Sequence, residues 1–241
     1  MLVNESARKR KLLDNFQCTT EKIAAACLKG GRDASAVELL AVTKYADSLE
    51  TGYLIESGKI KTAGENKVQD ADAKWVSGDL AKARKAVSLH FIGRLQSNKA
   101  VRAVELFDWI DSVDSLKLAE RISRHAGIQD KKMPVLIQLK LTACDTPGGV
   151  SPEHAAGLLA EVRKLPFLCP SGYMAIAPQG GDPERLRPLF AEVKKLFDRD
   201  FRGAVNEYGF RNYLSLGMSH DFEIAVQEGS NLPRIGSLLF S

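Results

Sequence analysis

The chain has 241 residues, of which 44% are hydrophobic and 27% are charged, and its formal net charge is +4. These values are typical of globular proteins, and they exclude a wholly disordered chain or a bundle of membrane helices. The length falls within the range of one large α/β unit, so we expect a single domain over residues 1–241. The basic residues are spread along the sequence, and nucleic acid is not an expected partner.

No segment has the features of a secretion signal, a membrane span or a metal site. Met1 to Asp14 lacks an apolar core followed by a cleavage site, and no apolar run approaches the roughly 20 residues that a membrane-spanning helix needs. A cytoplasmic protein without a membrane partner is therefore predicted. Cys18, Cys27, Cys144 and Cys169 form no C-x-x-C pair, which predicts free thiols, no metal ligands and an inert thiol at Cys144.

A long helix is predicted to open the chain. Asn4 to Leu28 carries apolar residues at helical spacing and is followed by Gly30-Gly31, a natural helix stop. After it, short apolar runs alternate with longer amphipathic segments, which is typical of repeated β-α units and a parallel sheet. The predicted strands are Glu38–Thr43, Lys59–Ala63, Ser88–Ile92, Trp109–Val113, Pro134–Leu141, Leu168–Ile176, Tyr213–Leu216 and Leu232–Ile235.

Eight parallel strands are the number that closes an α/β barrel. The segments between them, such as Pro152 to Lys164 and Pro183 to Phe197, combine apolar residues at i, i+3 and i+4 with charged outer faces, as the outer helices of a barrel do. Two stretches with glycine and proline, 146–149 and 178–183, have the length of loops and follow predicted strands. The pattern predicts a (β/α)8 TIM barrel with an extra N-terminal helix.

Small and polar residues follow the predicted strands. In a barrel, chemistry is carried by the C-terminal ends of the strands and by the loops after them. The residues at these positions are Lys44, Gly64-Glu65-Asn66, Gly93, Asp114, Gln138, Met174, Ser215 to Ser219 and Gly236-Ser237. One rim of the barrel is therefore predicted to hold the site.

Lys44 follows the apolar run Leu39 to Val42, so its stem leaves a buried strand and its amine is expected in a partly desolvated mouth. Partial desolvation favours the uncharged amine, which is the form that imine formation requires. On position alone, a surface lysine at the end of a strand is the simpler interpretation. The neighbouring turns decide between the two.

Two turns near the C-terminus predict a phosphate cup. Ser215 to Ser219 joins a strand to a helix that begins near Asp221, and Ile235-Gly236-Ser237 follows the last strand. Backbone N–H groups at the start of a helix attract anions, and the loops after strands seven and eight are the usual phosphate site of this fold. The structural alternative for each turn is Ser219 as an N-cap and Gly236 as a tight turn.

Arg234 and the histidines complete the candidates. Arg234 lies on the last strand, where its charge can pair with a buried carboxylate or face the ring of a bound cofactor. His90 alternates within a strand and is predicted to be a hydrogen-bonded core residue. His125, His154 and His220 fall on helices or at a helix start, and no serine or cysteine stands at a spacing that suggests a hydrolytic triad.

Several of these segments together resemble one family, the pyridoxal phosphate homeostasis proteins of the YggS/PROSC type, which are similar to the barrel domain of alanine racemase. The stretch from His90 to Lys99 and the turn from Ser215 to Ser219 are the most specific parts of the resemblance. In the family's order, the matching segments are Leu40–Lys44, Gly64–Gln69, His90–Lys99, Ser112–Ser115, Leu214–Asp221 and Arg234–Ser237.

The resemblance implies Lys44 as the lysine that holds pyridoxal 5′-phosphate as a Schiff base. It implies Asn66 near the ring substituents and Arg234 at the pyridine nitrogen. It places around the phosphate Ser215, Gly217, Ser219, Gly236 and Ser237. An arginine at the pyridine nitrogen keeps that nitrogen unprotonated and weakens the ring as an electron sink, so no residue is assigned a catalytic role.

The sequence departs from the family's pattern at several places, and its last residues are Phe240-Ser241 where the family has glycine. Ala63 stands where the family has phenylalanine, and Lys67 stands where it has tyrosine. Pro147-Gly148-Gly149 replaces a lysine-serine-glycine segment. Ala63 and Lys67 change the packing expected beside the cofactor. Pro147-Gly148-Gly149 removes side chains that could contact a ligand after the fifth strand.

Three functions stay open. The first is a monomeric carrier or regulator of pyridoxal phosphate that passes the cofactor to apo-enzymes and limits the free aldehyde, without turnover. The second is a pyridoxal-phosphate enzyme with weak racemase-like activity on amino acids. Two-base racemisation is expected to fail, because no second domain is seen after the eighth strand to supply the tyrosine base that alanine racemase uses. The third is a barrel that binds another phosphorylated metabolite, with Lys44 unmodified.

Overall fold

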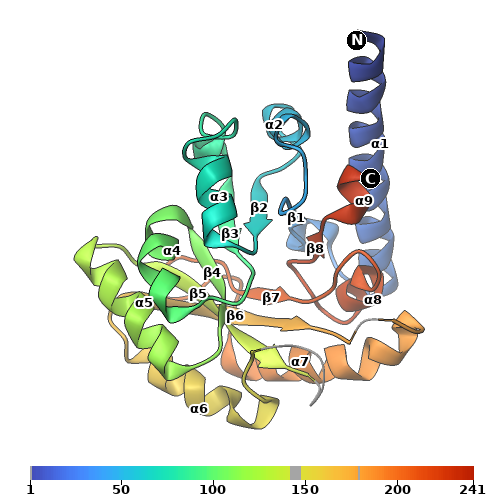
Figure 1. The fold of residues 1–241 in the computed structure, drawn as a ribbon. Helices are drawn as coiled ribbons and strands as arrows, with labels where there is room; N and C mark the ends of the chain where they lie inside the picture. The colour runs from blue at the N-terminus through green and yellow to red at the C-terminus, as the bar shows by residue number, and fades with distance from the viewer. Residues whose placement is uncertain (1, 142–147, 179) are drawn as a thin grey trace.

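The computed structural model describes residues 2–141, 148–178 and 180–241, in which eight parallel strands form a nearly closed barrel (Figure 1). Neighbouring strands pair in the order β7-β6-β5-β4-β3-β2-β1-β8. The strands are β1 (Leu40–Val42), β2 (Thr62–Glu65), β3 (Ser88–Phe91), β4 (Trp109–Val113), β5 (Met133–Lys140), β6 (Leu168–Ile176), β7 (Tyr213–Ser215) and β8 (Arg234–Ile235). The predicted (β/α)8 barrel with an N-terminal helix is confirmed.

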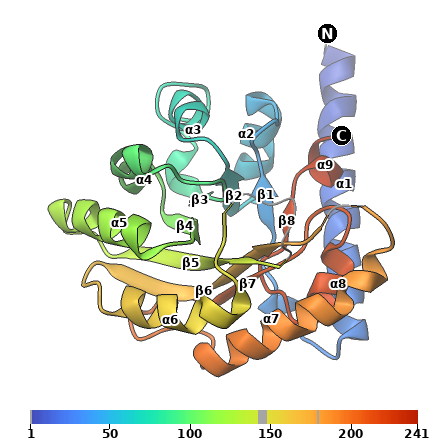
Figure 2. The same ribbon diagram turned by 60° about the horizontal axis from the view of Figure 1, so that its bottom comes forward.

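Helices α2 to α8 surround the strands, and α1 lies outside this ring (Figure 2). The α-helices are α1 (Leu2–Lys29), α2 (Ser48–Glu56), α3 (Val68–Trp75), α4 (Ala100–Leu106), α5 (Leu116–Ile128), α6 (Pro152–Arg163), α7 (Arg187–Asp200), α8 (Phe222–Gln227) and α9 (Ser237–Phe240). Short 3₁₀ helices are η1 (Ala34–Ala36), η2 (Arg84–Ala86), η3 (Ser97–Lys99) and η4 (Pro183–Leu186). In the described residues, no helix has the length and apolar character that crossing a membrane requires.

Several element boundaries differ from the predictions, and three of the differences have a reason in the backbone. The N–H groups of Lys59 and Ile60 donate to the carbonyl of Leu54 and close the end of α2, so β2 starts later, at Thr62. Pro233 has no N–H to give to a ladder, so β8 starts after it. The helix predicted from Pro183 to Phe197 is divided into η4 and α7, because Pro188 fits only the first turn of an α-helix.

Alternation along the strands sorts their side chains into two layers. Outward residues such as Ala41, Ala63 and Leu89 belong to the large core between strands and helices. A second cluster, inside the barrel, comprises Leu40, Trp109, Leu136, Met174, Tyr213 and Leu232. A Cβ at Gly64 would lie 2.5 Å from Leu40 Cδ2 and 3.1 Å from Ile92 Cδ1. The filled interior therefore requires glycine at this position.

A buried polar pair lies among the apolar residues inside the barrel. His90 Nδ1 lies 2.9 Å from Asp111 Oδ2, and both side chains are almost completely buried. The His90 ring also stacks on Trp109, with 5.1 Å between the ring centroids and 4° between the planes. The prediction that His90 is a hydrogen-bonded core residue is confirmed.

The seam between β7 and β8 is held by hydrogen bonds that do not form a regular ladder in the described residues. Asn231 Oδ1 accepts from the Leu214 N–H at 2.7 Å, and Asn231 Nδ2 donates to Asn212 O at 2.9 Å. The Arg234 N–H donates to Gly217 O at 3.0 Å. The two turns predicted to bind phosphate are thereby joined directly to each other.

The long helix α1 fixes the C-terminal end of the chain, which lies beside it (Figure 1). Asn15 Nδ2 donates to Leu239 O at 3.2 Å and to Ser241 O at 3.1 Å. Arg32, just after α1, donates to Ser230 O at 2.8 Å. The predicted phosphate turn at Gly236-Ser237 leads directly into α9. The bonds from Asn15 therefore fix the segment that follows this turn.

The described cysteines are free thiols, as predicted: Cys18 is exposed, and Cys27 and Cys169 are buried. Cys144 lies outside the described residues. Burial raises the pKa of the Cys27 thiol, and it raises the pKa of Cys169 to about 11. Since the thiolate is the nucleophile, both buried cysteines are poor targets at neutral pH.

We expect iodoacetamide at pH 8 to modify Cys18 in the folded protein and to leave Cys27 and Cys169 unmodified. The buried thiols lack both access and thiolate character. Peptide mass mapping of native and urea-unfolded samples checks this, and the unfolded sample should be modified at all three. Modification of Cys169 at the rate of Cys18 in the native protein would contradict the packing of β6.

Candidate functional site

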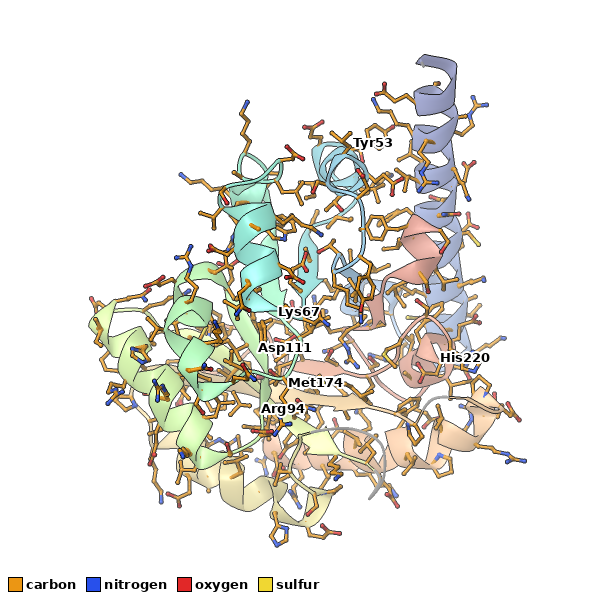
Figure 3. The ribbon with its side chains drawn as sticks, viewed as in Figure 1. Tyr53, Lys67, Arg94, Asp111, Met174 and His220 are labelled. Carbon is orange, nitrogen blue, oxygen red and sulfur yellow. The ribbon has the colours of Figure 1, made fainter. Side chains whose placement is uncertain are left out.

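A cavity of about 910 Å³ opens at the rim formed by the C-terminal ends of the strands. Arg94 and Met174 lie toward the middle of the barrel in Figure 3, and His220 lies near α8. Six of the eight predicted site residues line the cavity, namely Lys44, Asn66, Ser219, Arg234, Gly236 and Ser237. Residues from distant parts of the chain therefore meet on one rim, as the barrel topology predicts.

Lys44 reaches this cavity because it continues the inward alternation of β1. Leu40 and Val42 belong to the barrel interior, so the second residue after Val42 also faces inward. β1 ends at Val42, and Lys44 lies in the following turn, where its side chain is exposed and its Nζ is 5.1 Å from the centroid of the Tyr45 ring. This exposure of the side chain differs from the partly desolvated mouth that the sequence predicts.

Arg234 forms part of the cavity wall and is only 4% exposed. One terminal nitrogen donates to Ser215 O at 2.6 Å and to Ser215 Oγ at 2.8 Å, and the other donates to Ala175 O at 2.8 Å. Burial lowers the pKa of Arg234 to about 10, and the charges of Asp111 and Asp221 oppose this shift. Because these three hydrogen-bond acceptors are uncharged, the guanidinium keeps a positive charge available to a ligand in the cavity.

The turn after β7 is shaped for close packing on α8. Gly217 has φ +88°, and a Cβ there would lie 2.7 Å from both Ala225 Cβ and Phe222 Cα. The Met218 N–H donates to Asp221 Oδ1 at 2.6 Å, which fixes the far side of the turn. Gly217 does not line the cavity, whereas Met218 and Ser219 of the same turn do. Its close packing on α8 supports these two residues.

Both turns present backbone donors. In the part of the chain that the structure describes, the N–H groups of Ser219 and His220 have no backbone acceptor. The first N–H groups of α9, from Ser237 and Leu238, cannot find an acceptor within that helix. Donors of this kind suit an anion such as a phosphate.

Ser215 lies beneath the cavity and does not line it. Its buried hydroxyl donates to Leu232 O at 3.0 Å and accepts from Arg234. The predicted contact between Ser215 and a phosphate therefore stays a prediction, while its contact with Arg234 is direct. Spacing along the sequence gives no sign of this bond, because the two residues are on different strands.

Asn66 is held at the rim by the neighbouring loop. A Cβ at Gly93 would lie only 2.1 Å from Asn66 O, so the loops after β2 and β3 touch through a glycine. Ala63 is buried against the helix layer, and Lys67 is exposed, 3.7 Å from Asp70. Neither of these two departures from the family's pattern lines the cavity. Pro147, in the third departure, lies outside the described residues.

Arg94 and Asp221 are among the cavity residues that were not predicted to act in the site. Arg94 comes directly after Gly93 in the His90–Lys99 segment. Its position just past the end of a strand is the sequence feature that predicts a place on the rim. Asp221 is buried, and its carboxylate serves the Met218 N–H. An aspartate three residues after Met218 can accept a hydrogen bond from the Met218 N–H, so this spacing predicts a turn closed by the Asp221 side chain.

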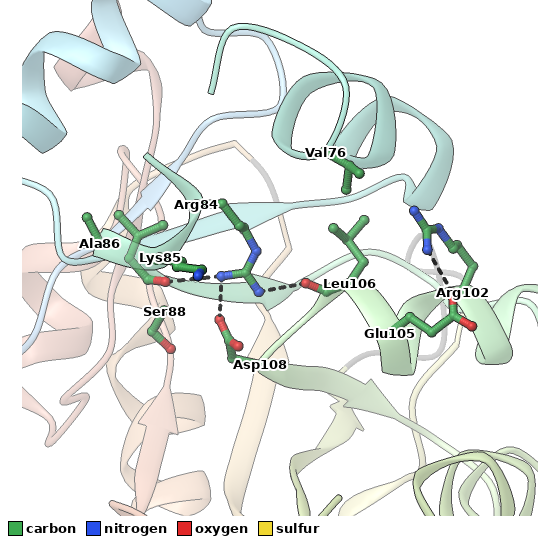
Figure 4. Close-up of a pocket in the computed structure, with 10 residues that line it drawn as sticks. Val76, Arg84, Lys85, Ala86, Ser88, Arg102, Glu105, Leu106 and Asp108 are labelled. Atoms are coloured by element: carbon green, nitrogen blue, oxygen red, sulfur yellow. Dashed lines mark hydrogen bonds and ion pairs between the residues drawn. The ribbon is translucent and has the colours of Figure 1, made fainter. Parts of the chain in front are cut away.

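A second hollow, of about 840 Å³, lies near η2 and α4 and is a poorer candidate (Figure 4). Arg84 is paired with Asp108 at 2.9 Å and bonded to Leu106 O at 2.6 Å. Arg102 is paired with Glu105 at 2.7 Å. The arginines in this hollow are thus occupied by protein partners.

Residues 20–241 match the family model described as the alanine racemase N-terminal domain. A pyridoxal phosphate homeostasis protein of Aquifex aeolicus is 35% identical over 225 residues, which cover 91% of this chain and 93% of the relative. The protein of the same name from Escherichia coli K12 is 34% identical and covers 94% of each chain. The chain belongs to the pyridoxal phosphate homeostasis protein family.

Solved structures agree with this placement. PipY of Synechococcus elongatus, with pyridoxal phosphate bound, is 34% identical with a TM-score of 0.76, covering 92% of this chain and 99% of its own. A protein of unknown function from Bifidobacterium adolescentis gives a TM-score of 0.85 at 31% identity, covering 97% and 96%. An alanine racemase of Clostridium difficile, 12% identical with a TM-score of 0.67, covers 94% of this chain and 56% of its own, and shares the fold.

We expect Ser215→Ala to lower the free energy of unfolding by about 1–3 kcal/mol, because it removes a buried acceptor from Arg234. Ser219→Ala is the matched control and should change the same quantity by less than about 0.5 kcal/mol, since Ser219 is only half-buried. Urea unfolding followed by circular dichroism measures both. Equal losses in the two variants would refute the bracing role of Ser215.

Proposed function

We propose that this chain binds pyridoxal 5′-phosphate as a Schiff base on Lys44 and serves as a carrier and regulator of that cofactor. The observation that carries the proposal is the meeting of an amine, a buried guanidinium and two donor-rich turns around one cavity. Pyridoxal phosphate has the three complementary groups: an aldehyde, a ring nitrogen and a phosphate. The bound pyridoxal phosphate of the PipY structure supports the same assignment.

Each residue has a distinct role in the proposal. Ser219 and Ser237, with the backbone of Gly236, hold the phosphate, and Gly217 gives the turn of Ser219 its shape. Asn66 contacts the ring substituents, and Ser215 acts through Arg234. These assignments suit the donor set, because backbone N–H and hydroxyl groups are common phosphate ligands at helix starts.

Arg234 favours a carrier over a catalyst. Its guanidinium cannot lend a proton to the ring nitrogen, and the unprotonated ring is a weak electron sink. The exposed side chain of Lys44 keeps the covalent link within reach of water and of a recipient protein. We place the protein in the cytoplasm as a monomer that passes its cofactor to apo-enzymes.

Weak racemase-like turnover is the second candidate function, and one observation favours it. The Tyr45 ring lies 5.1 Å from Lys44 Nζ and also lines the cavity, so a phenol stands close to the amine. A tyrosine can act as a general acid or base. Steady racemisation of alanine that is lost in Tyr45→Phe would establish this second function.

With saturating pyridoxal phosphate, we expect borohydride reduction to leave a pyridoxyl group on Lys44. Peptide mass spectrometry locates the adduct, and visible absorption reports the unreduced linkage. Lys44→Ala should lose both signals, because it lacks the amine that forms the imine. Lys67→Ala is the control, since Lys67 is exposed and does not line the cavity.

An adduct on another lysine, or none in the wild-type protein, would defeat the proposal. If pyridoxal phosphate binds without forming an adduct, a site for some other phosphorylated metabolite is favoured. Isothermal titration with inorganic phosphate then tests the cup by itself. In that titration, Ser219→Ala combined with Ser237→Ala should bind phosphate more weakly than the wild-type protein, as removal of two hydroxyl donors requires.

A further inference from the structure

Lys74, on α3, reaches behind the turn that carries Lys44. Its Nζ donates to Thr43 O at 2.6 Å and to Ala46 O at 3.3 Å. These two carbonyls stand on either side of the Lys44-Tyr45 pair, and the Ala46 N–H closes the same turn by donating to Thr43 O at 3.0 Å. The backbone that presents Lys44 is therefore held at two points by one ammonium group.

The ammonium is itself held by Glu65, at the end of β2. Glu65 is 1% exposed, and its Oε1 lies 3.3 Å from Lys74 Nζ. The same oxygen accepts from Thr43 Oγ1 at 2.8 Å and from Trp75 Nε1 at 3.1 Å. A buried carboxylate is costly unless it is paired and hydrogen-bonded, and this one is satisfied by Thr43, directly after β1, and by two donors on α3.

The network lies on the opposite face of the strand from the cavity. Ala41 packs in the outer layer, so Thr43 also points outward, and Lys44 points inward. Neither Glu65 nor Lys74 lines the cavity. Their effect on a ligand must therefore pass through the backbone around Lys44 and not through direct contact.

We propose that Lys74, held by Glu65, is a positioning residue that fixes the Lys44 turn so that the amine faces the cofactor aldehyde. The inference rests on the proposed function. It adds a support from outside the cavity to a side chain that is exposed and whose Nζ lies 5.1 Å from the centroid of the Tyr45 ring. A charge-assisted hydrogen bond to each flanking carbonyl restrains the turn more strongly than neutral bonds would.

The chain contains a matched control in Lys131. Its Nζ also donates to two backbone carbonyls, Val104 O at 2.9 Å and Phe107 O at 2.7 Å. Phe107 precedes β4, so this second clamp lies at the opposite end of the barrel from the cavity. Lys131→Met removes a comparable set of bonds and leaves the Lys44 turn intact.

The test compares Lys131→Met with Lys74→Met combined with Glu65→Gln. The glutamine is included because Lys74→Met alone leaves a buried carboxylate facing no cation. In the protein without cofactor, hydrogen exchange of the Ala46 amide should become about tenfold faster in the double variant, because the turn then opens more often. Lys131→Met should lower the melting temperature and leave the exchange of Ala46 unchanged.

The same variants are then titrated with pyridoxal phosphate, and the Lys44 adduct is trapped with borohydride. The half-saturating concentration should rise about tenfold in the double variant, as expected when charge-assisted bonds are lost. It should stay at the wild-type value in Lys131→Met. If the role of Lys74 were merely structural, the melting temperature would fall in both variants. The exchange of the Ala46 amide and the half-saturating concentration would then stay at their wild-type values.

The inference is overturned if the double variant traps cofactor at wild-type concentrations with unchanged Ala46 exchange, or if Lys131→Met shows the same losses. Absence of a Lys44 adduct in the wild-type protein is a different outcome, and it overturns the proposed function. Because hydrogen exchange is measured without cofactor, it separates failure of the clamp from failure of the site.

Discussion

The site depends on the burial of one arginine among uncharged acceptors. Arg234 starts β8, and its guanidinium binds Ser215 on β7 and Ala175 on β6, so it spans the seam where no regular ladder forms in the described strands. Burial of a cation without a directly bonded anion is unfavourable. The hydrogen bonds to Ser215 and Ala175 offset part of that cost, and the positive charge that remains is available to a bound ligand.

Alternation along β1 divides the work between the two faces of the strand. Leu40, Val42 and Lys44 follow one another on the inner face, which ends in the cavity, while Ala41 and Thr43 face the helices. The inner face can therefore present a reactive amine while the outer face supplies the bonds that hold its backbone. A slip of one residue in the register of β1 would exchange these roles and remove the amine from the cavity.

Short-range patterns in the sequence predict the barrel, the long first helix and the rim on which the candidates meet. They fail where the deciding hydrogen bond leaves no mark on the apolar pattern. The boundary of β2 depends on the Leu54 carbonyl at the end of α2, and Ser215 is bonded to Arg234 on another strand. The exposure of the Lys44 side chain is likewise not visible in the apolar run that precedes it. Most of the site is predictable because the strand ends share one rim. The residues that support it, such as Ser215, Glu65 and Lys74, are not predictable in this way.

These contacts also bear on how a cofactor could be both held and released. One of the two turns proposed to hold the phosphate leads into α9, whose end is bonded to Asn15 of α1, whereas Lys44 is exposed in a short turn. Under the proposed function, a ligand held at its phosphate and linked covalently at this exposed edge could exchange its linkage without moving the barrel. Attack by water or by another amine would then need only local access at the rim, which suits the proposed carrier.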